Sequence, residues 1–76
     1  MYDDNKMNDT IPEIIRCNIQ RYRKRFGCTA KQLSELIGCD SSYISKVEKG
    51  RVIPSLEKLI SIADYFKADL ADLLKE

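Results

Sequence analysis

The segment from Thr29 to Glu57 constrains the fold of this chain more than any other, because small, apolar and turn residues follow one another there at helical spacing: TAKQLSELIGCDSSYISKVEKGRVIPSLE. Thr29 can cap a helix that begins at Ala30, and Gln32, three residues further on, can reach back to close a capping box. The pattern therefore predicts a helix, a tight turn and a second helix within this segment.

The first helix of the pair has a short apolar face. Spacings of three and four residues place Leu33, Leu36 and Ile37 on that face. Ser34 is small enough for another helix to cross there. Gly38 can take a positive φ, so it ends the helix and allows the chain to turn sharply.

Asp40 caps the second helix, which we expect to run from Ser41 to about Lys49. Three residues cluster on its inner side: Ile44, Val47 and Glu48. Polar and basic residues of little bulk lie roughly opposite: Ser42, Ser45, Lys46 and Lys49. Side chains of this kind can approach base edges and phosphates closely.

Another helix is predicted before this pair. Thr10 and Glu13 can form a capping box around Pro12, which opens a helix through about Phe26. Its inward residues are expected to be Ile15, Ile19 and Tyr22. Gly27 stops it.

Two more helices follow the pair. Ser55 caps a fourth helix after a loop from Arg51 to Pro54. Its inner face is expected to consist of Leu56, Leu59, Ile60, Ala63 and Phe66. Asp69 caps a short fifth helix, and no strand pattern appears. We therefore predict an all-α, five-helix domain over residues 10–76, preceded by a flexible acidic tail over residues 1–9.

The composition argues against several function classes. A chain of 76 residues has room for one small core, and it contains no histidine and no glycine-rich phosphate loop, so we expect no enzyme. The three cysteines lack paired spacing and are interpreted as small hydrophobic residues, with redox sensing as the alternative: Cys17, Cys28 and Cys39. No metal, cofactor or small-molecule ligand is predicted. Without an apolar run of 18 residues or a signal segment, the chain is expected to be cytoplasmic, with no membrane partner.

The distribution of charge matters more than its sum. Thirteen basic and twelve acidic residues leave a net charge of +1. The basic residues gather in one acid-free stretch that holds Arg16, Arg21, Arg23, Lys24 and Arg25. Because salt screens charges beyond about 8 to 10 Å, a neutral protein with a basic face can still bind nucleic acid.

Taken together, these residues resemble the Cro/C1-type, or XRE, helix-turn-helix regulators, the group of lambda-like phage repressors and small controller proteins. The resemblance extends from about Ile15 to Leu74. It is carried by Arg23, Thr29, Leu33, Gly38, Tyr43, Ile44, Ser45, Glu48, Gly50, Pro54, Ser55, Leu56 and Ala63. It implies a lambda-repressor-like DNA-binding domain.

The resemblance also implies a structural ion pair between Arg23 and Glu48. Both residues point inward on the helical phase of their apolar neighbours, where an unpaired charge is costly. In the family these positions tie the first helix to the recognition helix. The alternative is that Arg23 contacts a phosphate directly.

The expected ligand is double-stranded DNA, with the helix over about residues 41–49 in the major groove. The candidates near the bases are Ser41, Ser42, Tyr43, Ser45 and Lys46. The candidates for phosphates are Thr29, Gln32, Lys49, Arg51 and Ser55. The chain is thus expected to be a small transcriptional regulator, a repressor or autoregulator.

One reading helix covers few base pairs, so a homodimer on a pseudo-palindromic operator is expected, with half-sites about 34 to 36 Å apart. The fifth helix is the expected dimer surface, through Leu70, Leu73 and Leu74, unless these leucines pack inward. The competing function is a protein-interaction module, such as an antitoxin-like accessory subunit, because the fold alone does not decide between them.

Overall fold

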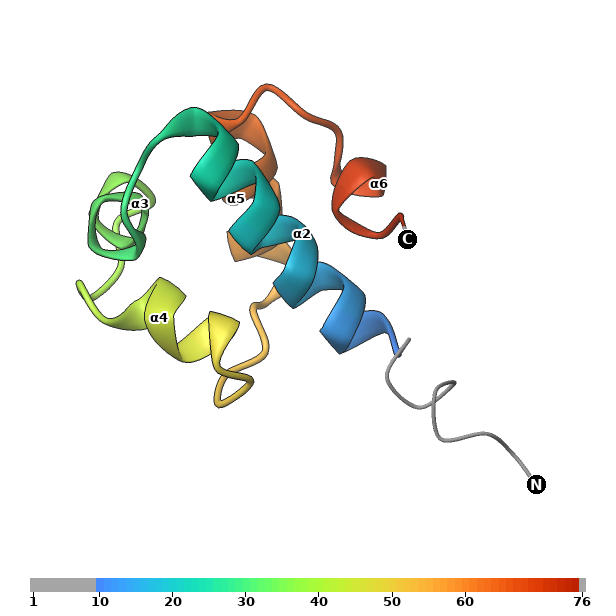
Figure 1. Ribbon diagram of the computed structural model, residues 1–76, viewed down its shortest axis with the longest axis horizontal. Helices are drawn as coiled ribbons and strands as arrows, with labels where there is room; N and C mark the ends of the chain where they lie inside the picture. The colour runs from blue at the N-terminus through green and yellow to red at the C-terminus, as the bar shows by residue number, and fades with distance from the viewer. Residues whose placement is uncertain (1–9, 76) are drawn as a thin grey trace.

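A computed structural model describes residues 10–75 of the chain as a bundle of helices, and no strand occurs in that range. The helices are α2 (Ile11–Phe26), α3 (Ala30–Leu36), α4 (Tyr43–Glu48), α5 (Leu56–Tyr65) and α6 (Leu70–Leu73). In Figure 1, α3 and α4 lie to one side of α2 and α6 lies to the other. The predicted all-α class is confirmed, while the expected tail over residues 1–9 lies outside the described residues.

All five helices contribute to one hydrophobic core. Its buried members are Ile15, Ile19, Leu33, Ile44, Val47, Leu59, Ile62, Ala63, Phe66 and Leu73. Tyr22 and Ile37 are partly buried against it. Because no helix here is longer than 16 residues, each owes its stability to this shared packing more than to its own hydrogen bonds.

Three residues expected on inner faces are exposed instead, which corrects the sequence prediction: Leu36 is 57 % exposed, Leu56 61 % and Ile60 45 %. In α5 the core contact is made by Ile62, which the sequence argument left out. Residues advance by 100° along a helix, so Ile60 and Ile62 lie on nearly opposite sides and cannot both face inward. In α3 the fully buried Ser34 lies on the inner face. Leu36, two residues further on, lies on nearly the opposite side of the helix and is therefore exposed.

The capping predictions have mixed outcomes. The capping box of α3 is confirmed: Gln32 N–H donates to Thr29 Oγ1 (3.0 Å), and Thr29 N–H donates to Gln32 Oε1 (2.8 Å). The box predicted at α2 is wrong, because the Thr10 side chain makes no capping hydrogen bond there, and Glu13 is paired with Arg16 instead.

α4 is shorter than predicted. It begins at Tyr43, because Ser41 and Ser42 form a turn in which Tyr43 N–H donates to the Asp40 carbonyl oxygen at 2.9 Å. It ends at Glu48, one residue before the predicted end. At α5, the predicted cap is present, since Lys58 N–H donates to Ser55 Oγ at 3.2 Å.

Asn18, which the sequence argument did not single out, attaches the end of the chain to α2. It is only 2 % exposed, and its Nδ2 donates to the carbonyl oxygens of Leu73 (2.8 Å) and Lys75 (2.7 Å). A buried amide with satisfied hydrogen bonds holds α6 in one place on α2.

Within residues 10–75, no helix is long and apolar enough to cross a membrane.

Candidate nucleic-acid interface

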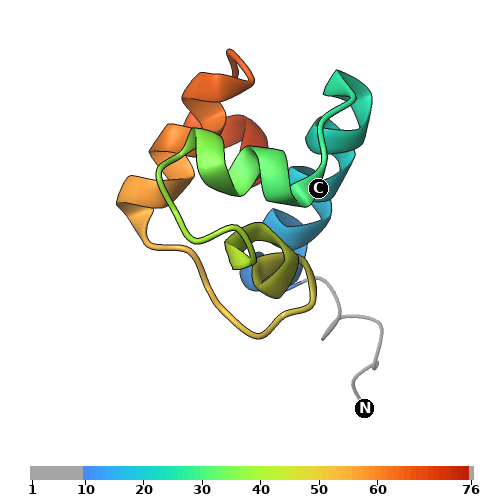
Figure 2. The ribbon, with the colours of Figure 1, turned by 90° about the vertical axis from the view of Figure 1, so that its left-hand side faces the viewer.

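Two buried apolar residues on the inner side of α4 attach it to the core, and its opposite side is exposed to solvent. Ile44 is fully buried and Val47 is 2 % exposed, whereas Lys46 is exposed. The helix packs against both α2 and α3. Figure 2 looks onto this end of the molecule, with α3 in front and the 49–55 loop running from α4 towards α5 at its edge.

Ser34 fixes the angle between the two helices of the pair. Its buried hydroxyl donates to the Ala30 carbonyl oxygen at 2.8 Å and accepts from Ile44 N–H at 2.8 Å. The Ile44 N–H lies in the first turn of α4, where backbone donors have no partner within the helix. The hydroxyl therefore joins α3 to α4 at their crossing, which the sequence argument anticipated only as a small side chain.

Arg23 on α2 and Glu48 on α4 form the ion pair that the resemblance implied. Arg23 Nε lies 2.7 Å from Glu48 Oε2, and Nη2 lies 2.9 Å from Oε1. Arg23 Nη1 also donates to the Cys28 carbonyl oxygen at 3.1 Å. The hydrogen bonds with Glu48 raise the pKa of Arg23, and the two side chains are only 15 % and 10 % exposed. Arg23 is thus engaged inside the protein and does not reach outward.

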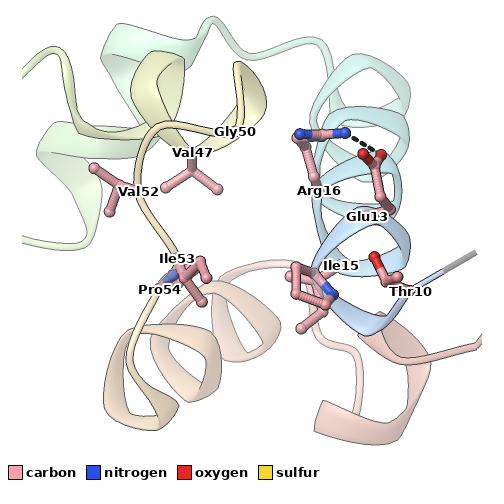
Figure 3. Close-up of a pocket in the computed structure, with 10 residues that line it drawn as sticks. Thr10, Glu13, Ile15, Arg16, Val47, Gly50, Val52, Ile53 and Pro54 are labelled. Carbon is pink, nitrogen blue, oxygen red and sulfur yellow. Dashed lines mark hydrogen bonds and ion pairs between the residues drawn. The ribbon is translucent and has the colours of Figure 1, made fainter. Parts of the chain in front are cut away.

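A second arginine of α2 lies against the end of α4. Arg16 is paired with Glu13, and its guanidinium lies so close to Gly50 that a Cβ there would overlap Nη1. Figure 3 shows Arg16 and Gly50 across a hollow of about 140 Å³ between α2 and the loop, with Val47 and Ile15 on its walls. Gly50 has a φ of 79°, so the position suits glycine on both counts.

The five candidates for base contact do not lie in equivalent settings. Ser41 and Lys46 are exposed, while Ser42 and Ser45 are half-buried. Tyr43 is partly buried against the core, and burial raises the pKa of its hydroxyl. Tyr43 is therefore more a packing residue than the other four.

Ser42 is held by Asp40. The Asp40 carboxylate accepts from Ser42 N–H at 3.1 Å and from the Ser42 hydroxyl, both at Oδ2. These hydrogen bonds, with a smaller effect of Lys46, lower the pKa of Asp40. Asp40 is therefore ionised at neutral pH.

All five candidates for phosphate contact are exposed: Thr29, Gln32, Lys49, Arg51 and Ser55. The capping box of α3 uses the acceptor atoms of Thr29 and Gln32, so the Thr29 hydroxyl proton and the Gln32 amide hydrogens remain available as donors. Ser55 is in the same state, because its oxygen accepts from Lys58 N–H. These five positions thus present donors and cations, which suit an anionic ligand.

The five basic residues of α2 fall into two groups. Arg16 and Arg23 are paired with acids, and Arg21 donates to Asn18 Oδ1. Arg25 lies over the Tyr22 ring, 5.7 Å from its centroid. Arg21, Lys24 and Arg25 are exposed, and their spacing of three and four residues places them on one side of α2.

The three leucines expected at the dimer surface lie in three different settings. Leu73 is fully buried in the core, Leu70 is partly buried against it, and Leu74 is 41 % exposed. The inward alternative is therefore correct for Leu73, which has no exposed surface to offer a partner. Of the three leucines, only Leu74, at the C-terminal end of α6, is largely accessible.

Another apolar surface lies between α2, α3 and α5. A hollow of about 470 Å³ is lined by seven residues: Phe26, Gly27, Cys28, Gln32, Glu35, Leu36 and Tyr65. Phe26 and Tyr65 both contact Phe66, with ring centroids 5.0 and 5.2 Å away. The sequence argument did not identify this surface.

The family comparison matches residues 19–73 to a helix-turn-helix family. Two curated relatives come from Archaeoglobus fulgidus, and both are described as uncharacterized HTH-type transcriptional regulators. One is 34 % identical over 59 residues, covering 78 % of this chain and 84 % of the relative. The other is 32 % identical over 59 residues, covering 78 % and 83 %.

Solved structures have the same arrangement of helices. A hypothetical transcription factor, NHTF, from Neisseria is similar in fold, with a TM-score of 0.82 at 23 % identity over 87 % of this chain and 76 % of that one. The clp gene regulator ClgR from Corynebacterium glutamicum gives a TM-score of 0.78 at 29 % identity, over 86 % and 69 % of the two chains.

Proposed function

The chain belongs to the helix-turn-helix family of DNA-binding transcription regulators, not to an enzyme family, and we propose that it binds double-stranded DNA sequence-specifically with α4 in the major groove. In this proposal it is a small cytoplasmic repressor or autoregulator. One observation carries the proposal: the inner side of α4 is locked to α2 and α3, while its other side presents exposed Lys46 beside partly exposed serines. A reading helix needs both a rigid support and a free polar face.

The phosphate contacts follow from the surrounding donors. Thr29 and Gln32 begin α3, and Lys49, Arg51 and Ser55 follow α4 along the loop, so they flank the reading helix on both sides. Contacts to phosphates set register and orientation, whereas contacts to base edges select the sequence.

We further propose that two copies bind a pseudo-palindromic operator. A single α4 of six residues reaches few base pairs, and a two-fold dimer doubles the number that are read. The exposed part of α6, Leu74 with the edge of Leu70, is the proposed contact between the copies.

The test is a binding isotherm of the purified chain on its own upstream DNA across a salt series, beside Lys46→Ala. Two copies that each bring Lys49 and Arg51 to phosphates would give a slope of log K against log salt of about −4. Loss of Lys46, the base-contacting cation, from both copies would weaken the preference for the upstream fragment and lower the affinity for it.

Lys75→Ala is the matched control, because Lys75 is exposed, carries the same charge and follows α6, at the far side of α2 from α4. It should leave the slope and the sequence preference unchanged. Weak binding that is indifferent to salt and to Lys46→Ala would contradict the proposal.

The alternative function, binding of a partner protein, is supported by one observation: Phe26, Leu36 and Tyr65 are exposed together around one hollow, which polar residues also line. Contiguous exposed apolar surface is typical of protein-binding sites. A polar substitution at Leu36 that abolishes regulation but leaves DNA affinity intact would favour this role.

A further inference from the structure

We propose that the outer side of α2 is a second binding surface, which takes an acidic segment of a partner protein. Its cations are Arg21, Lys24 and Arg25, which together are called the outer patch, and all three are exposed. This role goes beyond DNA binding, because the outer patch lies away from the reading helix α4.

The outer patch carries charge that the protein itself does not neutralise. The ion pairs within residues 10–75 involve other side chains, so no member of the patch has an acidic partner in that range. The spacing of three and four residues gathers the three cations within about 6 Å along the helix axis. Like charges at this spacing repel one another, and bound carboxylates would relieve that repulsion.

A hollow of about 340 Å³ lies beside the outer patch, between α2 and the segment of α6. Arg21, Tyr22 and Arg25 line it from α2, and Asp72 and Lys75 line the other wall. Lys75 Nζ lies 3.0 Å from Asp72 Oδ1, so the acid on this wall already has a cation as its partner. The hollow therefore keeps the charge of its two arginines.

Both arginines are held in place before any ligand arrives. Asn18, which is 2 % exposed, connects the two walls: its Oδ1 accepts from Arg21, and its Nδ2 donates to two carbonyl oxygens at and just after the end of α6, at 2.8 and 2.7 Å. Arg25 lies over the Tyr22 ring, 5.7 Å from its centroid. A guanidinium has five N–H donors, so each arginine keeps donors for a carboxylate. Groups positioned in advance lose little freedom on binding.

The position of the outer patch favours a protein ligand over DNA. The hollow and α6 lie across α2 from α4 (Figure 1). A helix with its side chains is about 10 Å thick, roughly one Debye length at physiological salt, so a duplex held by α4 leaves the patch free. A second copy is not the occupant, because a two-fold contact centred on the patch would bring identical cations together. Several aspartates or glutamates in one segment match the arginine forks.

The test uses the full chain, with octaglutamate as the probe and octaglutamine as its neutral control. In a titration followed by backbone amide NMR shifts, octaglutamate should perturb Arg21, Lys24 and Arg25, and octaglutamine should leave them unchanged. Shifts confined to residues 46–55 would overturn the inference, because the probe would then occupy the proposed DNA surface. Absence of octaglutamate binding would overturn it as well.

Two double variants that remove the same charge test the assignment by fluorescence anisotropy. Arg21→Gln combined with Arg25→Gln should weaken octaglutamate binding by roughly tenfold, because both guanidinium forks are lost. Lys31→Gln combined with Lys67→Gln, at exposed positions outside α2, should change the affinity by about twofold or less. Equal weakening by the two double variants would show attraction to net charge alone and would overturn the inference.

The affinity of the same variants for the upstream duplex separates this inference from the proposed function. Arg21→Gln combined with Arg25→Gln should keep the DNA affinity of the wild type. A matching loss of duplex binding in this variant would make the outer patch part of the DNA surface, which overturns the inference and leaves the proposed function intact. Octaglutamate binding at the patch by a wild type that does not bind the duplex would support the inference and contradict the proposed function alone.

Discussion

At the scale of single residues, the stability of this small domain depends on buried polar contacts, and the loss of either partner of such a contact is costly. Arg23 and Glu48 are held by two hydrogen bonds of 2.7 and 2.9 Å in a largely buried site. Removing one partner of such a pair leaves the other charge uncompensated, which costs more than the pair itself contributes.

Arg23→Ala should therefore lower the free energy of unfolding by about 3 kcal/mol, the lower end of the range for buried pairs, since both side chains keep some exposure. In a domain of this size the melting temperature would fall by roughly 10 °C or more. The measurement is thermal unfolding followed by circular dichroism. Lys75→Ala, which breaks an exposed pair with Asp72, should leave the melting curve close to that of the wild type, and equal melting curves for the two variants would refute this assignment.

Gly50 and Gly38 offer a second comparison. Both have positive φ, 79° and 77°, but a Cβ would overlap Arg16 at Gly50 and meet nothing within 4 Å at Gly38. Gly38→Ala should cost about 1 kcal/mol for the backbone alone. Gly50→Ala should cost about as much, because the overlapping Arg16 atom is the far end of a flexible side chain that can move aside. Denaturant titration of both variants checks this, and a clearly larger loss at Gly50 would show that Arg16 is held in place.

At the scale of the elements, two buried side chains decide how the helices meet. Ser34 connects α3 to α4, and Asn18 connects α2 to α6. Neither contact lies between residues that are close in sequence, so each fixes a crossing that local propensity leaves open.

Ser34→Ala should destabilise the fold by about 1 to 3 kcal/mol, because it leaves the buried Ile44 N–H without a partner. It should also weaken DNA binding under conditions where the variant is fully folded, since α4 loses the hydrogen bond that sets its angle. Ser61→Ala is the control: Ser61 is half-buried on α5 and makes no side-chain hydrogen bond within the described residues. Unchanged stability in Ser34→Ala would contradict the expectation.

Asn18→Ala should release α6 while the other helices remain folded. The carbonyl oxygens of Leu73 and Lys75 would lose their donor, and the short α6 has few hydrogen bonds of its own. Amide exchange should accelerate at Leu74, whose N–H donates to Ala71. Gln20→Ala, at an exposed position of α2, should leave exchange at α6 unchanged, and the inference fails if Asn18→Ala does the same.

At the scale of the whole molecule, the two apolar surfaces suggest different partners. α6 lies across α2 from the reading helix (Figure 1), and its burial of Leu73 leaves little area for a second copy. Stable interfaces bury about 800 Å² on each partner, whereas Leu74 is the one leucine of the three that is largely exposed.

We therefore expect the free chain to be monomeric at micromolar concentration and to pair on DNA. Leu74→Gln should reduce the cooperativity of binding to a two-half-site operator without changing affinity for a single half-site. Leu36→Gln, at an exposed leucine of the other apolar surface, is the matched control. Sedimentation of the free chain and of its DNA complex provides the stoichiometry, and a stable dimer in the absence of DNA would contradict this expectation.

Much of the fold could be predicted because its signals are local. The capping box of Thr29 and Gln32, the positive φ of Gly38 and the core positions Leu33, Ile44 and Val47 all follow from residues within one or two turns. The errors at Leu36, Leu56 and Ile60 have a common cause. Each belongs to an apolar stripe of its helix, and that stripe is wider than the part of the helix that packs against the core.

By itself, the sequence determined the helical class, the order of the helices and the family, because periodicity, caps and glycines act over a few residues. The resemblance to the family also implied the pair of Arg23 and Glu48, in agreement with the cost of burying a lone charge. Only the tertiary structure decided that Asn18 holds α6, that the Arg16 guanidinium lies against Gly50 and that Leu73 belongs to the core. These contacts join residues from distant parts of the chain, and their geometry is set by the way whole helices pack.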